Sequence, residues 1–271
     1  MVKELHRGPQ DCSLPGSAAV TAGSPENGLG PAMERGVISL GDGGSIVLGF
    51  PAGLADGPGI DFAVFENGFS DGFLELAMVE VSSNGHDFVA FPCFSETSVD
   101  RQKGPFDTLD ARCIFNLAGK YRAGFGTGFD LAGLPVSAGV DPNALQFVRI
   151  RDVVGSVNPA FGSRDSEGRL INDPWPTPFE SGGFDLDAVG LIHLKEDQLP
   201  MVWPAILRAG AEFHFLLPAG ETTACLFDVQ GRFLSSFPAG AGPARLPAGL
   251  APGIYFVGGS NRKRTRKIIL L

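Results

Sequence analysis

Cysteine is scarce in this sequence, and its few cysteines lack the spacing of a metal site. The chain has 271 residues and four cysteines, which are scattered along it as Cys12, Cys93, Cys113 and Cys225. Zinc sites need closer groups of cysteine and histidine. Cys93 and Cys113 could pair if the strands that carry them are neighbours, and a free buried thiol is equally compatible with each. The cysteines therefore do not indicate a cellular compartment.

Basic charge and long apolar runs are also lacking. Lysine and arginine number 21 against 30 aspartates and glutamates, which gives a formal net charge of −9. Because nucleic-acid-binding surfaces are basic, we expect no nucleic-acid partner. The basic run at residues 262–267 is typical of charges that protect the edge of a sheet. No apolar run approaches the ~18 residues of a membrane span, and the polar residues 1–6 do not predict a signal peptide within this chain.

Apolar residues at helical spacing are missing over any useful length, whereas glycine, proline and phenylalanine are plentiful. The sequence has 38 Gly, 21 Pro and 22 Phe, which is typical of short strands joined by many turns. We predict an all-β fold, a jelly-roll-like β-sandwich followed by a small Ig-like β-sandwich. The expected organisation is an irregular N-terminal segment at 1–35, the large domain at 36–195, a linker at 196–207 and the small domain at 208–271.

The strands of the large domain are predicted from apolar runs between turn residues. Asn84-Gly85 is a strong hairpin signal between expected strands at 73–82 and 86–91. The turn Gly41-Asp42-Gly43-Gly44 indicates a second hairpin, formed by residues 37–40 and 45–50. Further strands are expected at 60–66, 146–152 and 185–194.

Acidic residues at the ends of two predicted strands indicate a cation site. Asp185 and Asp187 stand two apart, so on a regular strand both carboxylates leave the same face. Asp61 and Glu66 occupy the two ends of another strand. Because Ca²⁺ prefers six to eight oxygen ligands, we predict a calcium site built from Asp61 or Glu66 together with Asp185 or Asp187. The alternatives are acids that bind backbone amides or a nearby arginine, and acids that act in catalysis.

Two long irregular segments, 116–134 and 153–184, carry the residues predicted to bind a ligand. These residues are Tyr121, Arg122, Phe125 and Trp175. Aromatic and arginine side chains on loops suit stacking against a flat ligand or a sugar face. The alternative is that Tyr121 and Trp175 cover the open end of the sandwich.

The C-terminal part carries a recognisable pattern. It comprises Leu226-Phe-Asp-Val-Gln-Gly-Arg232, Leu250-Ala-Pro-Gly-Ile-Tyr-Phe-Val257 and the ending Lys267-Ile-Ile-Leu-Leu271. Over roughly residues 205–271 the chain resembles the type IX secretion sorting domain of Bacteroidota. The resemblance implies export by the type IX secretion machinery and cleavage of this domain on attachment or release. One departure is Gly258-Gly259-Ser260, which replaces the usual longer strand.

The larger part is similar to a family of bacterial cell-surface proteins over about residues 20–195. The resemblance runs through the segments 37–46, 61–69 (Asp61-Phe-Ala-Val-Phe-Glu-Asn-Gly-Phe69), 117–125, 172–178 and 183–189. It implies surface display and an association with the outer-membrane uptake of cobalamin, and it supplies no catalytic residues. The closing Phe184-Asp-Leu-Asp-Ala-Val189 also resembles the last strand of jelly-roll carbohydrate-binding modules, where such an acid helps to hold a structural Ca²⁺.

Together these observations favour a secreted or cell-surface protein, peripheral to the outer membrane, that binds a small molecule or glycan without catalysis and is stabilised by Ca²⁺. The alternatives are capture of a cofactor such as cobalamin, a glycoside hydrolase, and a structural adhesin. A glycosidase needs two carboxylates about 5–10 Å apart across a cleft. Glu75 and Glu80 stand five apart on one predicted strand, so they point to opposite faces and do not form that pair, whereas Glu66 with Asp173 or Asp165 could form it, although nothing in the sequence brings them together.

Overall fold

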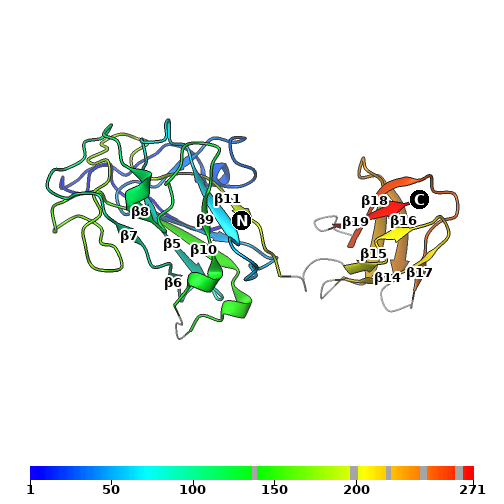
Figure 1. The fold of residues 1–271 in the computed structure, drawn as a ribbon. Helices are drawn as coiled ribbons and strands as arrows, with labels where there is room; N and C mark the ends of the chain where they lie inside the picture. Colours follow the sequence, from blue (N-terminus) through cyan, green and yellow to red (C-terminus); the bar gives the residue numbers. More distant parts are fainter. Residues whose placement is uncertain (136–138, 196–200, 218–220, 239–242, 260–264) are drawn as a thin grey trace. The chain divides into compact units, whose positions relative to one another are not determined.

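The computed structural model describes residues 1–135, 139–195, 201–217, 221–238, 243–259 and 265–271. The chain divides into two compact units, Met1–Leu194 (unit 1) and Lys195–Leu271 (unit 2) (Figure 1). Both units are built from β-strands, so the fold is all-β as predicted. The helices among the described residues are single 3₁₀ turns, namely η1 (Pro25–Gly28), η2 (Ala111–Cys113), η3 (Leu131–Gly133) and η4 (Pro142–Ala144). In this part of the chain no helix has the length and apolar character needed to cross a bilayer.

Unit 1 is a sandwich of two antiparallel sheets. The first sheet has the order β1 (Val2–His6), β3 (Ser45–Gly49), β10 (Phe147–Asp152), β5 (Ala77–Ser82) and β6 (Val89–Ala90). The second has the order β2 (Ile38–Ser39), β11 (Asp185–Leu191), β4 (Phe62–Glu66) and β9 (Thr127–Phe129). A separate ladder joins β7 (Phe94–Ser95) to β8 (Ile114–Phe115). Strands β2 to β5 alternate between the two large sheets, which gives the sandwich its jelly-roll-like character.

The core of unit 1 lies between the two large sheets. Alternate residues of each strand point inward, so Leu48 of β3 and Ile150 of β10 share one buried cluster with Phe62 of β4 and Leu186 of β11. Because the β5–β6 pair closes around Gly85, which has φ +80°, the predicted Asn84-Gly85 hairpin is confirmed. The strand ends and the long loops lie outside this core, and they carry the residues of the candidate sites.

Three sequence-based expectations for chain organisation differ from the structure. The second expected hairpin is not formed, because β2 pairs with β11 while β3 pairs with β1 and β10, so residues 41–44 cross between sheets. The segment 1–35 is not wholly irregular, since β1 pairs with β3 at the edge of the first sheet. The segment 196–207 contains β12 (Met201–Trp203) and β13 (Ile206–Leu207), while residues 196–200 of the expected linker lie outside the described residues.

Unit 2 has its own sheets and its own core. A five-stranded sheet has the order β13, β19 (Thr265–Leu270), β18 (Gly253–Gly259), β15 (Thr223–Phe227) and β16 (Phe233–Pro238). A three-stranded sheet has the order β12, β14 (Glu212–Leu216) and β17 (Ala244–Arg245). Phe213 and Val257 are fully buried in the core of this unit. The basic run at 262–267 was expected to protect the edge of a sheet. Its described part begins β19, which pairs with β18 along its length and with β13 near its C-terminal end. Residues 262–264 of the run lie outside the described residues.

Candidate functional site

Strand pairing brings together the acids at the end of β4 and the start of β11. Glu66 is paired with Leu186, so Glu66 and Asp185 lie at the same end of the second sheet, and both are buried. The register shifts between Leu186 and Ala188, which places Asp187 in a bulge. Strict alternation therefore does not hold between Asp185 and Asp187, and each carboxylate has its own donors.

The donors to these two carboxylates come from different segments. Asp185 accepts hydrogen bonds from the Ser39 hydroxyl and from Asn67 Nδ2, the latter at 3.1 Å. Asp187 accepts two bonds from the Met33 backbone N–H, at 2.9 and 3.1 Å. Each carboxylate is thus held by neutral groups.

Three further acids, Glu75, Asp152 and Asp173, are buried and interact electrostatically with Glu66 or Asp185, and we call these five acids the buried acid cluster. Glu75 precedes β5, Asp152 ends β10, and Asp173 lies on the long segment before β11. The Leu76 N–H donates to Asp173 Oδ2 at 2.8 Å, which fixes Asp173 beside the start of β5. Asp152 accepts the N–H of Phe184 at 2.7 Å and that of Gly43 at 2.9 Å, one on each oxygen.

The cluster contains carboxylate oxygens that have no partner. Gly68 N–H donates to Glu66 Oε2 at 2.8 Å, but Glu66 Oε1 is buried without a hydrogen bond. Asp173 Oδ1 is likewise buried and unpartnered. Among the described residues no lysine or arginine forms an ion pair with any member of the cluster. Burial of a charge without a partner is costly, so this cluster needs a proton or a cation.

Burial and mutual repulsion raise the pKa of the acids in this cluster. Desolvation, together with the charges of Asp185 and Asp187, raises the pKa of Glu66 to about 8, although the Gly68 N–H opposes the shift. Desolvation raises the pKa of Asp185 to about 6. The pKa values of Glu75, Asp152 and Asp173 are raised well above the ordinary range, by burial first and then by neighbouring carboxylates.

Asp61 lies at the other end of β4 from this cluster. Its carboxylate accepts the N–H groups of Gly57 and Leu131, both at 2.7 Å, and lies 2.7 Å from His193 Nδ1. Asp61 and Glu66 stand five positions apart along extended chain, which corresponds to a distance of roughly 17 Å. Asp61 therefore cannot share an ion with Asp185, and the sequence-based alternative that paired them is wrong for this physical reason.

Asp61 belongs instead to a small acidic trio with Asp56 and Asp130. One carboxylate oxygen of each lies within 4.8 Å of the others, and Asp56 is exposed. The Asp61 oxygens are already engaged by backbone N–H groups and His193. The trio is therefore explained as a structural anchor that ties β4 to the chain after β11.

A row of phenylalanines lies on loops that leave the strands. This phenylalanine row consists of Phe69, Phe73, Phe106 and Phe179, whose successive ring centroids are 5.0, 6.5 and 5.9 Å apart. Phe69 is 79% exposed, Phe106 71% and Phe179 43%. Phe69 and Phe73 stand on the segment between β4 and β5, which begins after Glu66, ends at Leu76 and also carries Glu75. A contiguous exposed group of large apolar side chains is characteristic of an interaction site.

The predicted ligand residues Arg122 and Phe125 lie beside this row. The Arg122 guanidinium stands 5.1 Å from the centroid of the Phe125 ring and forms an ion pair with Asp71 at 3.2 Å. Asp71 belongs to the same loop as Phe69, and the Ala123 N–H donates to the Gly68 carbonyl at 2.9 Å. Tyr121 is exposed next to them, with Lys120 Nζ 5.9 Å from its ring centroid. These contacts tie the loop of Tyr121, Arg122 and Phe125 to the loop that carries the row.

Trp175 is held differently from the other predicted ligand residues. Its Nε1–H donates to Asp42 Oδ2 at 2.9 Å, and its ring stacks on Phe161 with centroids 6.5 Å apart. The side chain is half-buried, and no ring contact among the described residues joins it to the phenylalanine row. Trp175 is therefore explained as a covering residue over Asp42, which agrees with the alternative that the sequence left open for it.

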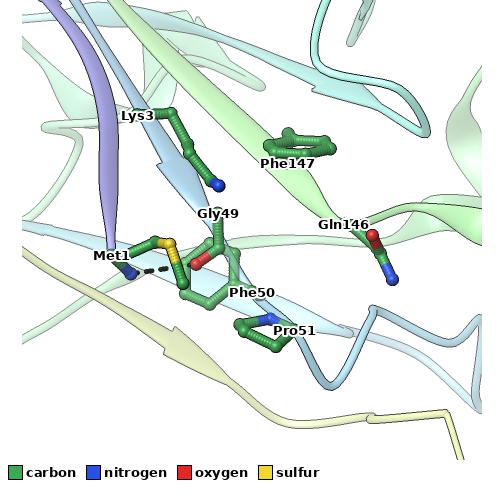
Figure 2. A pocket seen from close by; sticks show the side chains of 7 residues that line it. All are labelled: Met1, Lys3, Gly49, Phe50, Pro51, Gln146 and Phe147. Carbon is green, nitrogen blue, oxygen red and sulfur yellow. Dashed lines mark hydrogen bonds between the residues drawn. The ribbon is translucent and has the colours of Figure 1, made fainter.

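Two cavities of unit 1 are lined by residues that belong neither to the buried acid cluster nor to the phenylalanine row. Figure 2 shows one of about 260 Å³, lined by Met1, Lys3, Gly49, Phe50, Pro51, Gln146 and Phe147 and lacking an acidic side chain. There the Met1 amino group donates to the Gly49 carbonyl at 3.0 Å. A second cavity, of about 330 Å³, is lined partly by Glu96, Asp100 and Asp110. Hydrogen bonds from Arg112 lower the pKa of Asp110 to about 2, which does not suit a general acid.

Sequence reasoning missed several members of both groups. Glu75 lies between two leucines, and a lone acid in an apolar setting is a signal for a buried carboxylate, whereas Asp152 follows Arg151 on β10 and has no such signal. Asp173 has no such local signal, because its burial depends on the loop fold. Phe69 and Phe106 stand among Gly, Ser, Asp and Pro in predicted loops, where a large apolar residue has no core to join.

Comparison with known proteins leaves the family of this chain open. No family model matches the sequence, and no curated protein matches it significantly. Among solved structures, one described as "Biofilm associated protein - BSP domain" aligns with 91% of this chain at 10% sequence identity and a TM-score of 0.22. The aligned part covers 53% of that structure's chain, about half of its length. The functional conclusion therefore depends on the residues of this chain.

Proposed function

We propose that unit 1 is a non-catalytic binding domain and that the phenylalanine row is its capture surface. The observation that carries this proposal is the exposure of Phe69 and Phe106 within a row of stacked rings. Removing a phenylalanine side chain from water contributes about 1.5–3 kcal/mol, so covering these rings supplies substantial binding free energy. Aromatic side chains also lose little conformational entropy when they are covered.

The ligand should offer an apolar face and a polar or anionic edge. The row presents phenyl rings without hydrogen-bonding groups, and the Arg122 guanidinium lies at its border beside Asp71. Among the ligand classes that the sequence suggests, the apolar face of a glycan and a corrin ring such as that of cobalamin meet this description. A glycosidase is less well supported, because Asp110 in the acid-lined cavity is held ionised by Arg112.

We further propose that unit 2 serves export through the type IX machinery and that the protein acts outside the cell, peripheral to the outer membrane. The support is the sequence resemblance together with the structural role of its motif residues. Asp228 accepts the backbone N–H and the Nε–H of Arg232 at 2.9 and 2.6 Å, and the Gly231 N–H donates to the Asp228 carbonyl at 2.9 Å. The Tyr255 hydroxyl donates to the Ala251 carbonyl at 2.8 Å. These contacts explain why both motifs have those residue types.

The capture proposal is tested by applying the full chain to a glycan array and to immobilised cobalamin. We expect one of these ligands to be retained. Phe69→Ala or Phe106→Ala should weaken its binding by roughly 30-fold, the equivalent of about 2 kcal/mol for a central aromatic anchor. The matched control is Phe115→Ala, which removes an exposed phenylalanine outside the row and should leave binding unchanged. The proposal would be contradicted if the chain bound neither a glycan nor cobalamin, or if binding were unchanged in both row variants. Either result would favour the alternative that the protein is a structural adhesin.

The export proposal has a separate test. Unit 2 is fused to a secreted reporter in a Bacteroidota strain with an intact type IX machinery and in a strain that lacks it. We expect the reporter at the cell surface or in the medium only in the intact strain. Equal distribution in the two strains would show that unit 2 is not a sorting domain.

A further inference from the structure

The five-stranded sheet of unit 2 is apolar on both sides. One side faces the core of this unit, to which its strands contribute Leu207, Leu226, Phe237, Val257, Ile268 and Leu270. A sheet with only one covered side normally carries polar residues on the other. Here the residues that alternate with the core positions are also apolar. We call this second side the outer apolar face, and its residues are Ile206, Phe227, Phe233, Ile254, Phe256 and Ile269.

Strand register aligns the three isoleucines of this face. Ile206 of β13 pairs with Ile269 of β19, and Ile269 pairs in turn with Ile254 of β18. Paired residues of neighbouring strands point to the same side of a sheet and stand about 5 Å apart, so the three side chains are neighbours. Ile206 is 56% exposed and Ile254 is 44% exposed. The structure therefore leaves these side chains without a covering layer.

The three aromatic side chains lie next to the isoleucines. Phe256 stands two residues after Ile254 on β18 and hence on the same side of the sheet. Phe227 of β15 pairs with Phe256 and with Phe233 of β16. The ring centroids of Phe227 and Phe233 are 6.3 Å apart, and Phe233 is 52% exposed on the edge strand. The apolar face thus extends across all five strands, and an exposed apolar surface of this kind marks an interaction site.

Basic side chains accompany the outer apolar face. Lys267 is exposed and pairs with Phe256, and Arg208 is exposed two residues after Ile206. Neither of these basic side chains forms an ion pair with a described acid. Residues 195–271 contain nine lysines and arginines against five acids, whereas the whole chain has 21 against 30. The positive charge of the protein is therefore concentrated in the unit that carries this face.

We propose that the outer apolar face of unit 2 binds an anionic lipid surface. A lipid surface offers an apolar layer to the isoleucines and phenylalanines and offers phosphate groups to Lys267 and Arg208. Long basic side chains bury their apolar stems and keep the charged group at the level of the headgroups. Buried apolar area and attraction to anionic lipids together set the strength of such binding.

A second copy of the chain is the competing partner for this face. A symmetric dimer brings the same surface of both copies together, so two positively charged units would meet. The five strands of the sheet contain no aspartate or glutamate that could neutralise Lys267 of the other copy. Like charges brought together in an interface oppose association. An anionic lipid surface supplies the missing negative charge, and this difference favours lipid.

The test measures co-sedimentation of the full chain with vesicles of phosphatidylcholine alone and with vesicles that also contain the anionic lipid phosphatidylglycerol. We expect binding to the anionic vesicles, weaker binding to phosphatidylcholine, and a decrease as salt is added. Ile254→Ser should weaken binding to both kinds of vesicle, by about 10-fold for the anionic ones. Lys267→Gln should weaken binding to the anionic vesicles by about 5-fold and leave binding to phosphatidylcholine unchanged.

The matched controls lie outside the face. Ile60→Ser changes an isoleucine of unit 1 that is 47% exposed, and Arg245→Gln changes an exposed basic residue on the three-stranded sheet. Both controls should bind vesicles as the wild type does. Because Ile254 and Lys267 are exposed, the thermal transition of unit 2 should stay in place in their variants, which confirms that each variant is folded.

Absence of wild-type binding to either kind of vesicle, or wild-type binding by both face variants, would overturn the proposal. A dimer in analytical ultracentrifugation that becomes a monomer in Ile254→Ser would assign the face to a second copy and overturn the lipid assignment. The proposal goes beyond the export role of unit 2, and its test is separate from the reporter assay. A chain that is exported but binds no vesicles would overturn the lipid contact alone.

Discussion

Raising the pH in the absence of metal should destabilise unit 1, and Glu66 gives the magnitude. Its pKa rises from 4.5 to about 8 in the folded protein, so the folded state holds a proton that the unfolded state has released. Stability falls with pH wherever the folded state binds more protons than the unfolded state. Protonated Glu66 makes its full contribution to the free energy of unfolding below pH ~4.5, and this contribution is lost as the pH rises through ~8. The rise of the Glu66 pKa from 4.5 to about 8 corresponds to a loss of about 5 kcal/mol in the free energy of unfolding.

This loss is large compared with the stability of a typical domain, about 5–15 kcal/mol. The assay is urea unfolding of the full chain in EDTA at pH 5, 6, 7 and 8, followed by circular dichroism. We expect the free energy of unfolding of unit 1 to decrease steadily over this range.

Glu66→Gln isolates the contribution of this carboxyl group. The variant keeps an oxygen for the Gly68 N–H but has no charge to bury, so in EDTA its stability should depend less on pH than that of the wild type. The matched control, Glu180→Gln, changes an exposed glutamate and should follow the wild-type curve. The reasoning is refuted if wild-type stability in EDTA is flat or increases from pH 5 to 8. Parallel curves for Glu66→Gln and the wild type would also refute it.

Other predictions concern parts of the molecule outside this cluster. Asp61→Ala should lower the free energy of unfolding, measured by urea titration, by about 3 kcal/mol, because it leaves buried N–H groups such as that of Leu131 without an acceptor. A loss below about 1 kcal/mol would contradict this prediction. Burial, and then Asp42, raise the pKa of the Cys12 thiol to about 12. Alkylation of Cys12 by iodoacetamide at pH 8 should therefore be slow in the wild type and faster in Asp42→Asn. Rapid alkylation of the folded wild type would contradict this prediction. Phe213→Ala should destabilise unit 2 by about 3–5 kcal/mol while the calorimetric transition of unit 1 stays in place, and a shift of both transitions would mean that the units do not unfold separately.

Local sequence patterns determined the fold class and most of the strands. Period-two apolar runs such as Phe147–Asp152 become strands because their alternate side chains can enter a core. Asn84-Gly85 determined its hairpin because Gly85 adopts a positive φ without steric cost. The partners of β2 and β3 were not predictable in this way, because a glycine turn joins strands of one sheet or of two sheets equally well, and distant residues decided the outcome.

For the candidate sites, too, some residues were identified from the sequence and others only from the tertiary structure. The sequence by itself identified Glu66 and Asp185 as acids at strand ends, and it found Arg122 and Phe125 on an exposed loop. Only the tertiary structure separated Asp61 from Asp185, because antiparallel pairing of β4 with β11 places their carboxylates at opposite ends of the sheet.

The same dependence on tertiary structure applies to burial. Glu75, Asp152 and Asp173 stand on different segments of the chain, and each is buried because loops and strand ends that are distant in sequence pack over it. The phenylalanine row arises in the same way, since Phe69, Phe106 and Phe179 come from separate loops. A sequence specifies which side chains are acidic or apolar, but whether they are buried or exposed depends on the chain segments that pack around them.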